Sequence, residues 1–446
     1  MQKGVIWAGS NDGLIHVSRD DGKTWVNVTP KGLAPGGRVQ NLEPGTHQAG
    51  TAYAAIYRFL LGDFKPYIYR TDDFGKSWTL LTDGKNGIAI DEPTRVVRED
   101  PDRAGLLYAG TEFGMHISFD NGAHWQSFQL NLPAAPVTDI KVAHKDLVLS
   151  TQGRSFWILD NLTPLHQIAD TSASATAILF APREAVRSPG RSGFGRGSTL
   201  QYPLGGAAID YYLGSAPTGD ISMEILDASG KVIRKFTSAG IAAADAAPPV
   251  EADAGGDDGE GGPRVRSGPT RLDKTAGMHR FTWDLRYPGP WMNAARPEGP
   301  NGPVAVPGKF SVRLTVGTWT ATKPFTLIED PRITKSGVTN RELTEQFEHN
   351  IRVRDLVSDL NHLLARIRSL RTDPPSPAAL VKVNDLASHV ITPSIRYSKP
   401  ELATHITYLY TVTNSTDQKI GDDVVERYQA LRKELDQRIA ELNAIK

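Results

Sequence analysis

The sequence predicts a mainly β protein with an α-helical tail, and three observations carry this prediction. A turn motif recurs at intervals of about 50 residues within residues 1–165, as structural repeats do. Stretches in which apolar and polar residues partly alternate run from residue 179 to residue 330, which is typical of strands. After Pro331 apolar residues return every three or four positions, which indicates amphipathic helices.

The repeated motif reads Ser/Thr-x-Asp-x-Gly-x-x-Trp. Its Asp carboxylate can accept backbone N–H bonds within its own turn, its Gly supplies a positive φ, and its Trp starts the next strand with a large ring to bury. Each copy follows two strand-like segments joined by a turn, which together predict a blade of an Asp-box β-propeller. The motif residues are Ser18, Asp20, Gly22 and Trp25; Thr71, Asp73, Gly75 and Trp78; and Ser118, Asp120, Gly122 and Trp125.

The repeat predicts three to four blades of a partial propeller. Units two to four open with an additional strand, at 39–42, 95–99 and 137–142, which the first unit lacks, and the fourth unit has strands but no box. A propeller closes with four to eight blades. We therefore expect residues 1–165 to be the C-terminal blades of an N-terminally truncated propeller whose remaining blades belong to the full-length protein. Completion of the ring by a second chain is the alternative.

The rest of the chain divides by composition and periodicity. We expect a connector at 166–178, a small β-sandwich at 179–330 and an α-helical hairpin bundle at 331–446. The sandwich is interrupted at 239–275 by a segment rich in Ala, Gly, Pro and acidic residues, which we expect to be disordered. The helices are expected at 343–367, 380–390, 401–412 and 422–442.

Composition excludes several classes of function. Lys plus Arg and Asp plus Glu both number 50, so nothing favours nucleic acid as a partner. Cysteine is absent, which excludes disulfides and thiolate metal sites, and the histidines show no metal-ligand spacing, so we expect no metal and no cofactor. The N-terminus does not read as a signal peptide, and no apolar run is long enough to predict a membrane span.

Candidate catalytic groups are weakly marked. Glycoside hydrolysis needs two carboxylates on either side of the sugar bond. Glu99 and Glu112 are the candidates at strand ends, together with Glu43, Asp100 and Asp139, and for each of them a turn or surface carboxylate is the favoured interpretation. Aromatic residues are dense around the blades; we expect most of them in the core and a few at channel-side turns, where they could hold a peptide or a sugar. The aromatic residues are Tyr53, Tyr57, Phe64, Tyr67, Tyr69, Phe113, Phe156 and Trp157.

Beyond the boxes, several stretches resemble the sortilin-like, BNR-repeat propeller proteins of bacteria, which are often labelled glycosyl hydrolases. The stretches are Gly50–Tyr53, Phe64–Asp73, Val97–Pro101, Gly153–Asp160 and Thr282–Pro288. The resemblance covers nearly the whole chain and places it in the C-terminal half of such a protein. Members of the family are about twice as long and carry a signal peptide. The resemblance therefore implies that the parent protein is extracytoplasmic, either secreted or periplasmic.

Two functions follow as expectations. The first is an extracytoplasmic recognition module that binds a protein, a peptide or a glycan, because the box repeat comes without a catalytic set. The alternative is a glycoside hydrolase of the BNR-repeat type whose active site lies partly in the N-terminal half of the parent protein.

Overall fold

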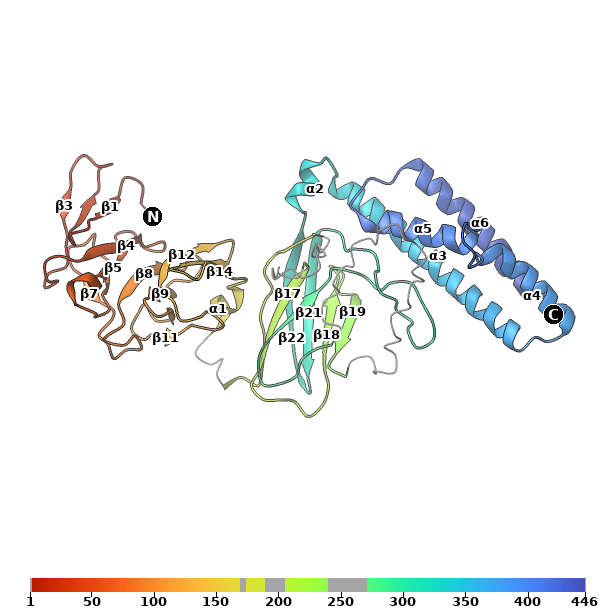
Figure 1. The fold of residues 1–446 in the computed structure, drawn as a ribbon, viewed down its shortest axis with the longest axis horizontal. Helices are drawn as coiled ribbons and strands as arrows, with labels where there is room; N and C mark the ends of the chain where they lie inside the picture. The colour runs from red at the N-terminus through yellow and green to blue at the C-terminus, as the bar shows by residue number, and fades with distance from the viewer. Residues whose placement is uncertain (1, 169–173, 189–204, 240–270, 446) are drawn as a thin grey trace. The chain divides into compact units, whose positions relative to one another are not determined.

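The computed structural model describes residues 2–168, 174–188, 205–239 and 271–445 of the 446-residue chain (Figure 1). It confirms a mainly β chain with a helical C-terminal region. The chain divides into two compact units, Met1–Ile168 and Ala169–Lys446. Most of the expected disordered segment at 239–275, and part of the expected connector at 166–178, lie outside the described residues.

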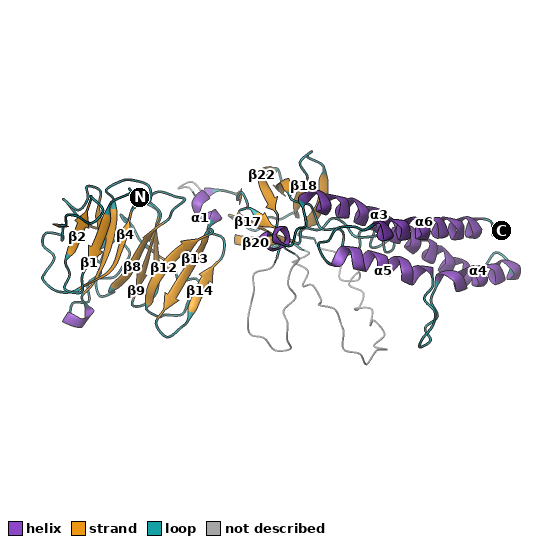
Figure 2. Cartoon of the chain, turned by 90° about the horizontal axis from the view of Figure 1, so that it is seen from above, coloured by secondary structure: helices purple, strands orange, loops and turns teal. Residues whose placement is uncertain are grey.

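The first unit consists of four successive antiparallel sheets, each a meander in chain order (Figure 2). The middle two sheets have four strands, whereas the first and last have three. The first sheet comprises β1 (Ile6–Gly9), β2 (Ile15–Ser18) and β3 (Val26–Asn27), and the second β4 (Arg38–Pro44), β5 (Ala52–Tyr57), β6 (Ile68–Thr71) and β7 (Thr79–Leu80). The third comprises β8 (Thr94–Glu99), β9 (Leu107–Thr111), β10 (Met115–Ser118) and β11 (Gln126–Ser127), and the fourth β12 (Val137–Ala143), β13 (Asp146–Thr151) and β14 (Phe156–Leu159).

Small apolar cores lie between neighbouring sheets of this unit. Ile15 and Val17 of the first sheet pack with Ala54 of the second. In the same way Tyr53 of the second sheet packs in one cluster with Leu107 of the third. A third cluster joins the third and fourth sheets. The second and third sheets are therefore covered on both faces, whereas the first and fourth have a neighbouring sheet on one face only. Successive propeller blades pack in this way.

The second unit begins with two sheets that share one core. The core contains Trp283, Phe310 and Phe325, whose rings contact one another. Two sheets facing a common core form a β-sandwich. The smaller sheet has the order β15 (Ala177–Leu179), β17 (Ala207–Leu213) and β20 (Gly277–Trp283). The larger has the order β16 (Ala185–Val186), β22 (Trp319–Ile328), β21 (Gly308–Val316), β18 (Ile221–Leu226) and β19 (Val232–Thr237).

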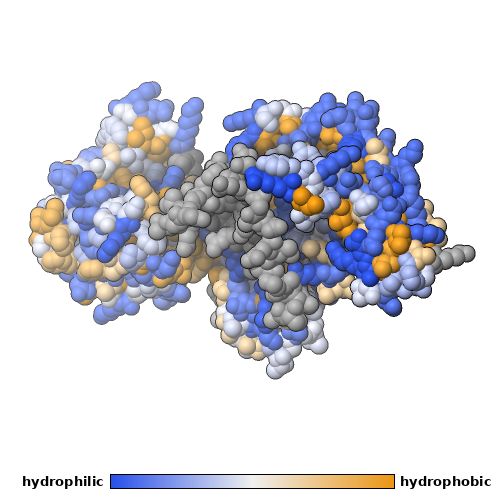
Figure 3. All heavy atoms as spheres, turned by 45° about the vertical axis from the view of Figure 1, so that its right-hand side comes forward, coloured by the Kyte–Doolittle hydropathy of each residue, from blue (hydrophilic) through white to orange (hydrophobic). Residues whose placement is uncertain are grey.

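The helical region follows a short helix and contains four longer helices around one apolar core. α3 begins at a capping box, in which the Thr339 hydroxyl accepts the Glu342 N–H while the Glu342 carboxylate accepts the Thr339 N–H at 2.8 Å. Hydrophilic residues dominate the face of this region seen in Figure 3, with small apolar spots between them. The helices are α2 (Pro331–Lys335), α3 (Asn340–Thr372), α4 (Pro377–Val390), α5 (Leu402–Ser415) and α6 (Asp422–Asn443). In the part of the chain that the structure describes, none of the helices combines the length and apolar character of a membrane span.

Candidate functional site

The three Asp-box turns share one set of hydrogen bonds. In each turn the Asp carboxylate accepts the backbone N–H four residues later at 2.9 Å, and the Ser or Thr hydroxyl accepts the Gly N–H at 2.8–2.9 Å. Hydrogen bonds from the Ser77 side chain and backbone lower the pKa of Asp73 to about 2. Each Asp is thus ionised and bonded within its own turn, so the boxes are structural turns without a free acid.

The boxes define one end of the sheets, which we call the box end. Ser118, the first box residue of the third sheet, pairs with Leu107 on β9, and Leu107 pairs in turn with Glu99 on β8, so Glu99 lies at the same end. The opposite end, which we call the loop end, carries the connections between β5 and β6 and between β9 and β10. Every candidate residue of the first unit can be assigned to one of these ends by its strand register.

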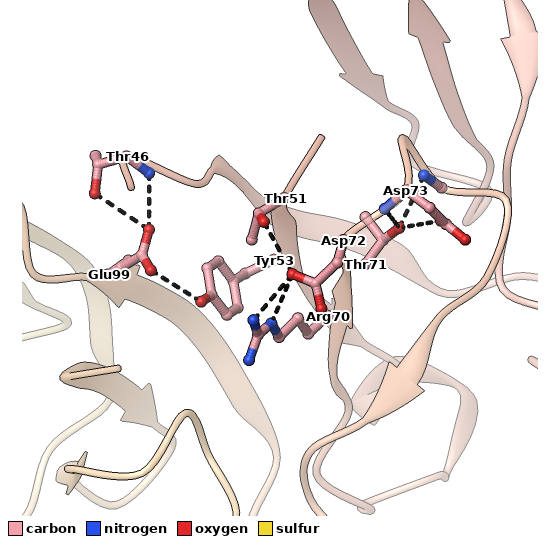
Figure 4. Close-up of polar contacts among 9 residues, drawn as sticks. Thr46, Thr51, Tyr53, Arg70, Thr71, Asp72, Asp73 and Glu99 are labelled. Atoms are coloured by element: carbon pink, nitrogen blue, oxygen red, sulfur yellow. Dashed lines mark hydrogen bonds and ion pairs between the residues drawn. The ribbon is translucent and has the colours of Figure 1, made fainter. Parts of the chain in front are cut away.

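Glu99 lies buried at the box end with its carboxylate fully engaged (Figure 4). It accepts the Thr46 N–H at 2.7 Å, the Thr46 hydroxyl at 3.1 Å and the Tyr53 hydroxyl at 3.1 Å. Burial, together with the nearby Glu99 charge, raises the pKa of Tyr53. Glu99 therefore ties the β4–β5 connection to the third sheet and is not a free catalytic group.

Glu112 lies at the loop end, just beyond the point where Thr94 pairs with Thr111. Its carboxylate accepts the Arg95 Nε–H at 2.5 Å, and Arg95 also donates to the Tyr57 hydroxyl at 3.3 Å. Burial raises the pKa of Tyr57 to about 12, with a further contribution from Glu112. Glu112 thus belongs to a polar cluster with an aromatic ring.

The structure does not bring Glu99 and Glu112, the two catalytic candidates that the sequence singles out, together. Glu99 and Glu112 lie at opposite ends of the β8–β9 pair. At about 3.3 Å per residue, five residues of strand separate them by about 16 Å. Paired carboxylates of glycosidases lie at most about 9.5 Å apart. Strand register therefore does not place these two carboxylates as a pair on one sugar bond, and register is not readable from residue type.

Asp100 is also a structural group. One of its oxygens accepts the N–H groups of Asp102 and Arg103 at 2.8 and 3.0 Å, and the other contacts the Tyr108 hydroxyl at 2.8 Å and the His166 ring at 2.9 Å. Burial alone would raise the pKa of Asp100, but these hydrogen bonds lower it. Among the described residues, Asp100, Asp102 and His166 are the group whose ligand atoms lie within 4.8 Å of one another, as a metal site requires. The buried carboxylate is already satisfied by the protein, so the geometry does not call for a metal there.

A second pair of carboxylates, Glu43 and Asp139, lies on either side of Arg98, and the three residues belong to the first strands of three sheets. Arg98 on β8 contacts Glu43 on β4 and donates to Asp139 on β12 at 2.8 Å, and its Nε–H donates to the Ile140 carbonyl at 2.7 Å. Burial raises the pKa of Glu43 even though Arg98 and Lys141 act to lower it. The Asp139 side chain is 64% exposed. One guanidinium thus holds a half-buried and an exposed carboxylate side by side.

Aromatic rings gather at the loop end, in the connection between β5 and β6. Phe59 lies on a one-turn 3₁₀ helix, η1 (Phe59–Leu61), and stacks on Tyr57 with centroids 5.7 Å apart. Phe64 meets Phe59 edge to face at 5.2 Å. Phe59 and Phe64 are 39% and 46% exposed. Sequence reasoning missed Phe59, although an apolar run within a connection is the signal that could have found it.

Arg58 holds this connection in place. Its guanidinium donates to the carbonyls of Ala34 and Gly36, both at 2.6 Å, and pairs with Asp63 at 2.8 Å. The Arg95 guanidinium lies 4.9 Å from the centroid of the Tyr57 ring. The rings of Phe59 and Phe64 are exposed, whereas the Arg95 and Glu112 side chains beside them are 16% and 14% exposed. We call Tyr57, Phe59, Phe64, Arg95 and Glu112 the loop-end cluster.

Comparison with known proteins gives limited similarity. No family model matches the chain. A curated oligoxyloglucan-reducing end-specific xyloglucanase of Emericella nidulans is 32% identical over 117 residues, which are 24% of this chain and 13% of that protein. The chain therefore spans a small part of the relative that it matches.

Three solved structures are also similar. A GH74 xyloglucanase from Xanthomonas campestris matches with a TM-score of 0.28 and 14% identity, over 35% of this chain and 27% of that one. YCF48 bound to D1 peptide matches with a TM-score of 0.27 and 13% identity, over 50% and 61% of the two chains. An ancestral GH74 enzyme matches with a TM-score of 0.28 and 12% identity, over 52% and 31%.

Replacing Glu99 tests its structural role. In Glu99→Gln one buried oxygen that now accepts hydrogen bonds becomes an NH₂ group, which leaves a buried donor without its acceptor. We expect the free energy of opening of β5 and β8, measured by native-state hydrogen exchange, to fall by about 1–3 kcal/mol. Asp91→Asn, at an exposed carboxylate of the same unit, is the control and should change it little. Equal opening free energies in Glu99→Gln and the unmodified chain would show that the bonds do not hold the sheets.

Proposed function

We propose that this chain is a glycan-recognition protein whose first unit, three to four blades of an Asp-box propeller, binds a saccharide at the loop-end cluster. The proposal places the parent protein outside the cytoplasm, as the resemblance to sortilin-like, BNR-repeat proteins implies. It treats residues 1–165 as the recognition part, 179–330 as a sandwich and 331–446 as a helical support.

The observation that carries the proposal is the chemistry of the loop-end cluster. Sugars present flat C–H faces and rims of hydroxyl groups. The exposed rings of Phe59 and Phe64 offer apolar faces for the former, and the adjoining Arg95–Glu112 pair offers donors and acceptors for the latter. Binding sites commonly combine aromatic walls with a few polar groups that fix orientation.

The charge of the cluster favours a neutral glycan. Arg95 is paired with Glu112, and Arg58 with Asp63, so neither guanidinium beside the rings carries an uncompensated charge. An anionic sugar would have to compete with these carboxylates. The similarity over 117 residues to a xyloglucanase supports a neutral, glucan-based ligand of the same class.

Calorimetric titration of the full chain with xyloglucan oligosaccharides tests this proposal. We expect binding that weakens at least tenfold in Phe64→Ala and in Phe59→Ala, because each variant removes about 1.4 kcal/mol or more of ring contact. Tyr397→Ala is the matched control, since this ring is 90% exposed and belongs to the second unit. Unchanged affinity in both Phe variants would remove the cluster from the site. A chain that binds peptides but no glycan on a mixed panel would overturn the ligand class.

Glycoside hydrolysis is a second candidate, favoured by the carboxylates that Arg98 holds. A general acid needs a raised pKa, and burial raises the pKa of Glu43. Asp139, exposed beside it, would act as the base or nucleophile of the pair. In this mechanism Glu43 protonates the leaving oxygen while Asp139 activates water or attacks the anomeric carbon.

Turnover of xyloglucan oligosaccharides by the full chain decides this second candidate. We expect reducing-end release that falls at least a hundredfold in Glu43→Gln and in Asp139→Asn, whereas Asp91→Asn keeps full activity, because only the first two remove a reacting carboxyl group. Absence of turnover, or turnover that survives both substitutions, would leave Arg98 with the structural role of joining β4, β8 and β12.

A further inference from the structure

The turn η1, between β5 and β6, presents two adjacent aliphatic side chains to solvent. Leu60 is 83% exposed, more than any other large apolar side chain described in the first unit, and its neighbour Leu61 is 57% exposed. In Figure 2 the turn is the short helix that lies beyond the ends of the strands of the first unit. Single apolar residues are common at protein surfaces, but adjacent ones at the tip of a connection are typical of a contact site.

Hydrogen bonds hold this turn in one conformation. The Leu61 N–H donates to the Arg58 carbonyl at 2.8 Å, and the Gly62 N–H donates to the Phe59 carbonyl at 3.0 Å. Gly62 has a φ of 74°, which ends the turn in a conformation that favours glycine. The Arg58 guanidinium is buried and paired with Asp63. The exposed leucines therefore belong to an ordered element that presents them to solvent.

The shape of the turn disfavours a flat protein partner. A 3₁₀ helix makes one turn in three residues, so three consecutive side chains point in three directions. Phe59 stacks on Tyr57. Leu61 lies against Gly36, since a Cβ on that glycine would be 3.3 Å from the Leu61 Cδ1 atom, and Leu60 projects into solvent. A flat surface would cover one side of such a turn, whereas lipid molecules close around an inserted side chain from every direction.

Basic side chains flank the turn. Arg38 pairs with Tyr57 across β4 and β5, so it lies beside the start of η1, and Lys65 follows the turn in the same connection. Both residues are exposed, and neither has an ion-pair partner among the described residues. The acidic residue of the connection, Asp63, is paired with Arg58. The two remaining cations complement the anionic headgroups of phospholipids.

We propose that η1 docks the chain on an anionic lipid bilayer. Leu60 and Leu61 enter the interfacial region of the membrane, while Arg38 and Lys65 contact the phosphate groups of the lipids. The site goes beyond the proposed glycan recognition, because neither leucine belongs to the loop-end cluster. Two apolar side chains and two cations give reversible adsorption to the membrane surface.

A fluorescent probe on the turn tests the proposal. The chain contains no cysteine, so Leu60→Cys provides a single labelling site for an environment-sensitive dye. Vesicles of phosphatidylcholine and phosphatidylglycerol in equal amounts are added to the labelled full chain. We expect the dye emission to shift to the blue, because the dye passes from water into the apolar part of the bilayer.

Ile395→Cys provides the control for the dye. This side chain is 74% exposed and lies in the second unit, so a dye at this position should keep its emission wavelength when vesicles are added. An unshifted dye at position 60, or equal shifts at both positions, would overturn the proposal.

Cosedimentation of unlabelled variants with the same vesicles measures each contribution. We expect Leu60→Asp to weaken binding at least tenfold, because a carboxylate replaces the inserted side chain. Arg38→Ala and Lys65→Ala should each weaken it about fivefold on the mixed vesicles and change it little on phosphatidylcholine alone. Ile395→Asp is the matched control and should bind as the unmodified chain does.

Hydrogen exchange of β5 and β6 is expected to be the same in Leu60→Asp as in the unmodified chain, because position 60 is exposed. A chain that binds neither kind of vesicle, or that binds the mixed vesicles equally well with Leu60→Asp, would contradict the proposal. Capture of a protein that depends on Leu60, with no binding to vesicles, would make η1 a protein contact and would contradict it as well.

Discussion

One repeated contact between sheets organises the first unit. An aliphatic residue of one sheet packs against the glycine of the next box, and its carbonyl accepts a hydrogen bond from the indole of that box. Val28 with Gly75 and Trp78 forms one such contact, and Leu81 with Gly122 forms the other. Box and partner lie on different sheets, so the motif acts between sheets as much as within its own turn. The contact joins the first sheet to the second and the second to the third. The first strands β4, β8 and β12 lie side by side.

This stacking separates the chemistry of the two ends. At the box end the buried carboxylates of Glu99 and Asp100 accept hydrogen bonds that join turns and sheets. At the loop end, the rings of Phe59 and Phe64 are exposed beside a largely buried Arg95–Glu112 pair. Alignment of the first strands places Arg98 between Glu43 and Asp139, which lie 96 residues apart in sequence. The proposed recognition and hydrolysis sites both depend on that order.

The mainly β chain with a helical C-terminal region was predictable, because turn chemistry and periodicity are local signals. Extra strands in units two to four, expected at 39–42, 95–99 and 137–142, correspond to β4, β8 and β12. Local signals could not supply the register of the strands or show which sheet packs against which. Glu99 and Glu112 carry the same functional group, yet Glu99 joins two sheets at the box end and Glu112 lies beside aromatic rings at the loop end. Strand register alone sets this difference. The expectation that a box Trp buries its ring fits Trp125 but was wrong for Trp25, since burial there depends on a neighbouring sheet. α3 runs from Asn340 to Thr372 and so exceeds the expected 343–367, because polar residues extend both of its ends. At its start the capping box precedes the first apolar residue.

A double-mutant cycle between Leu81 and Trp125 tests most directly whether this contact organises the unit. Leu81→Ala removes the aliphatic side chain and Trp125→Phe removes the indole donor, and the opening free energy of the second and third sheets is measured by native-state hydrogen exchange for both single variants and the double variant. We predict a coupling free energy of about 1–2 kcal/mol, as found for residues in direct contact. Effects that add within about 0.3 kcal/mol would show that the two residues stabilise the sheets independently and would contradict this organising role.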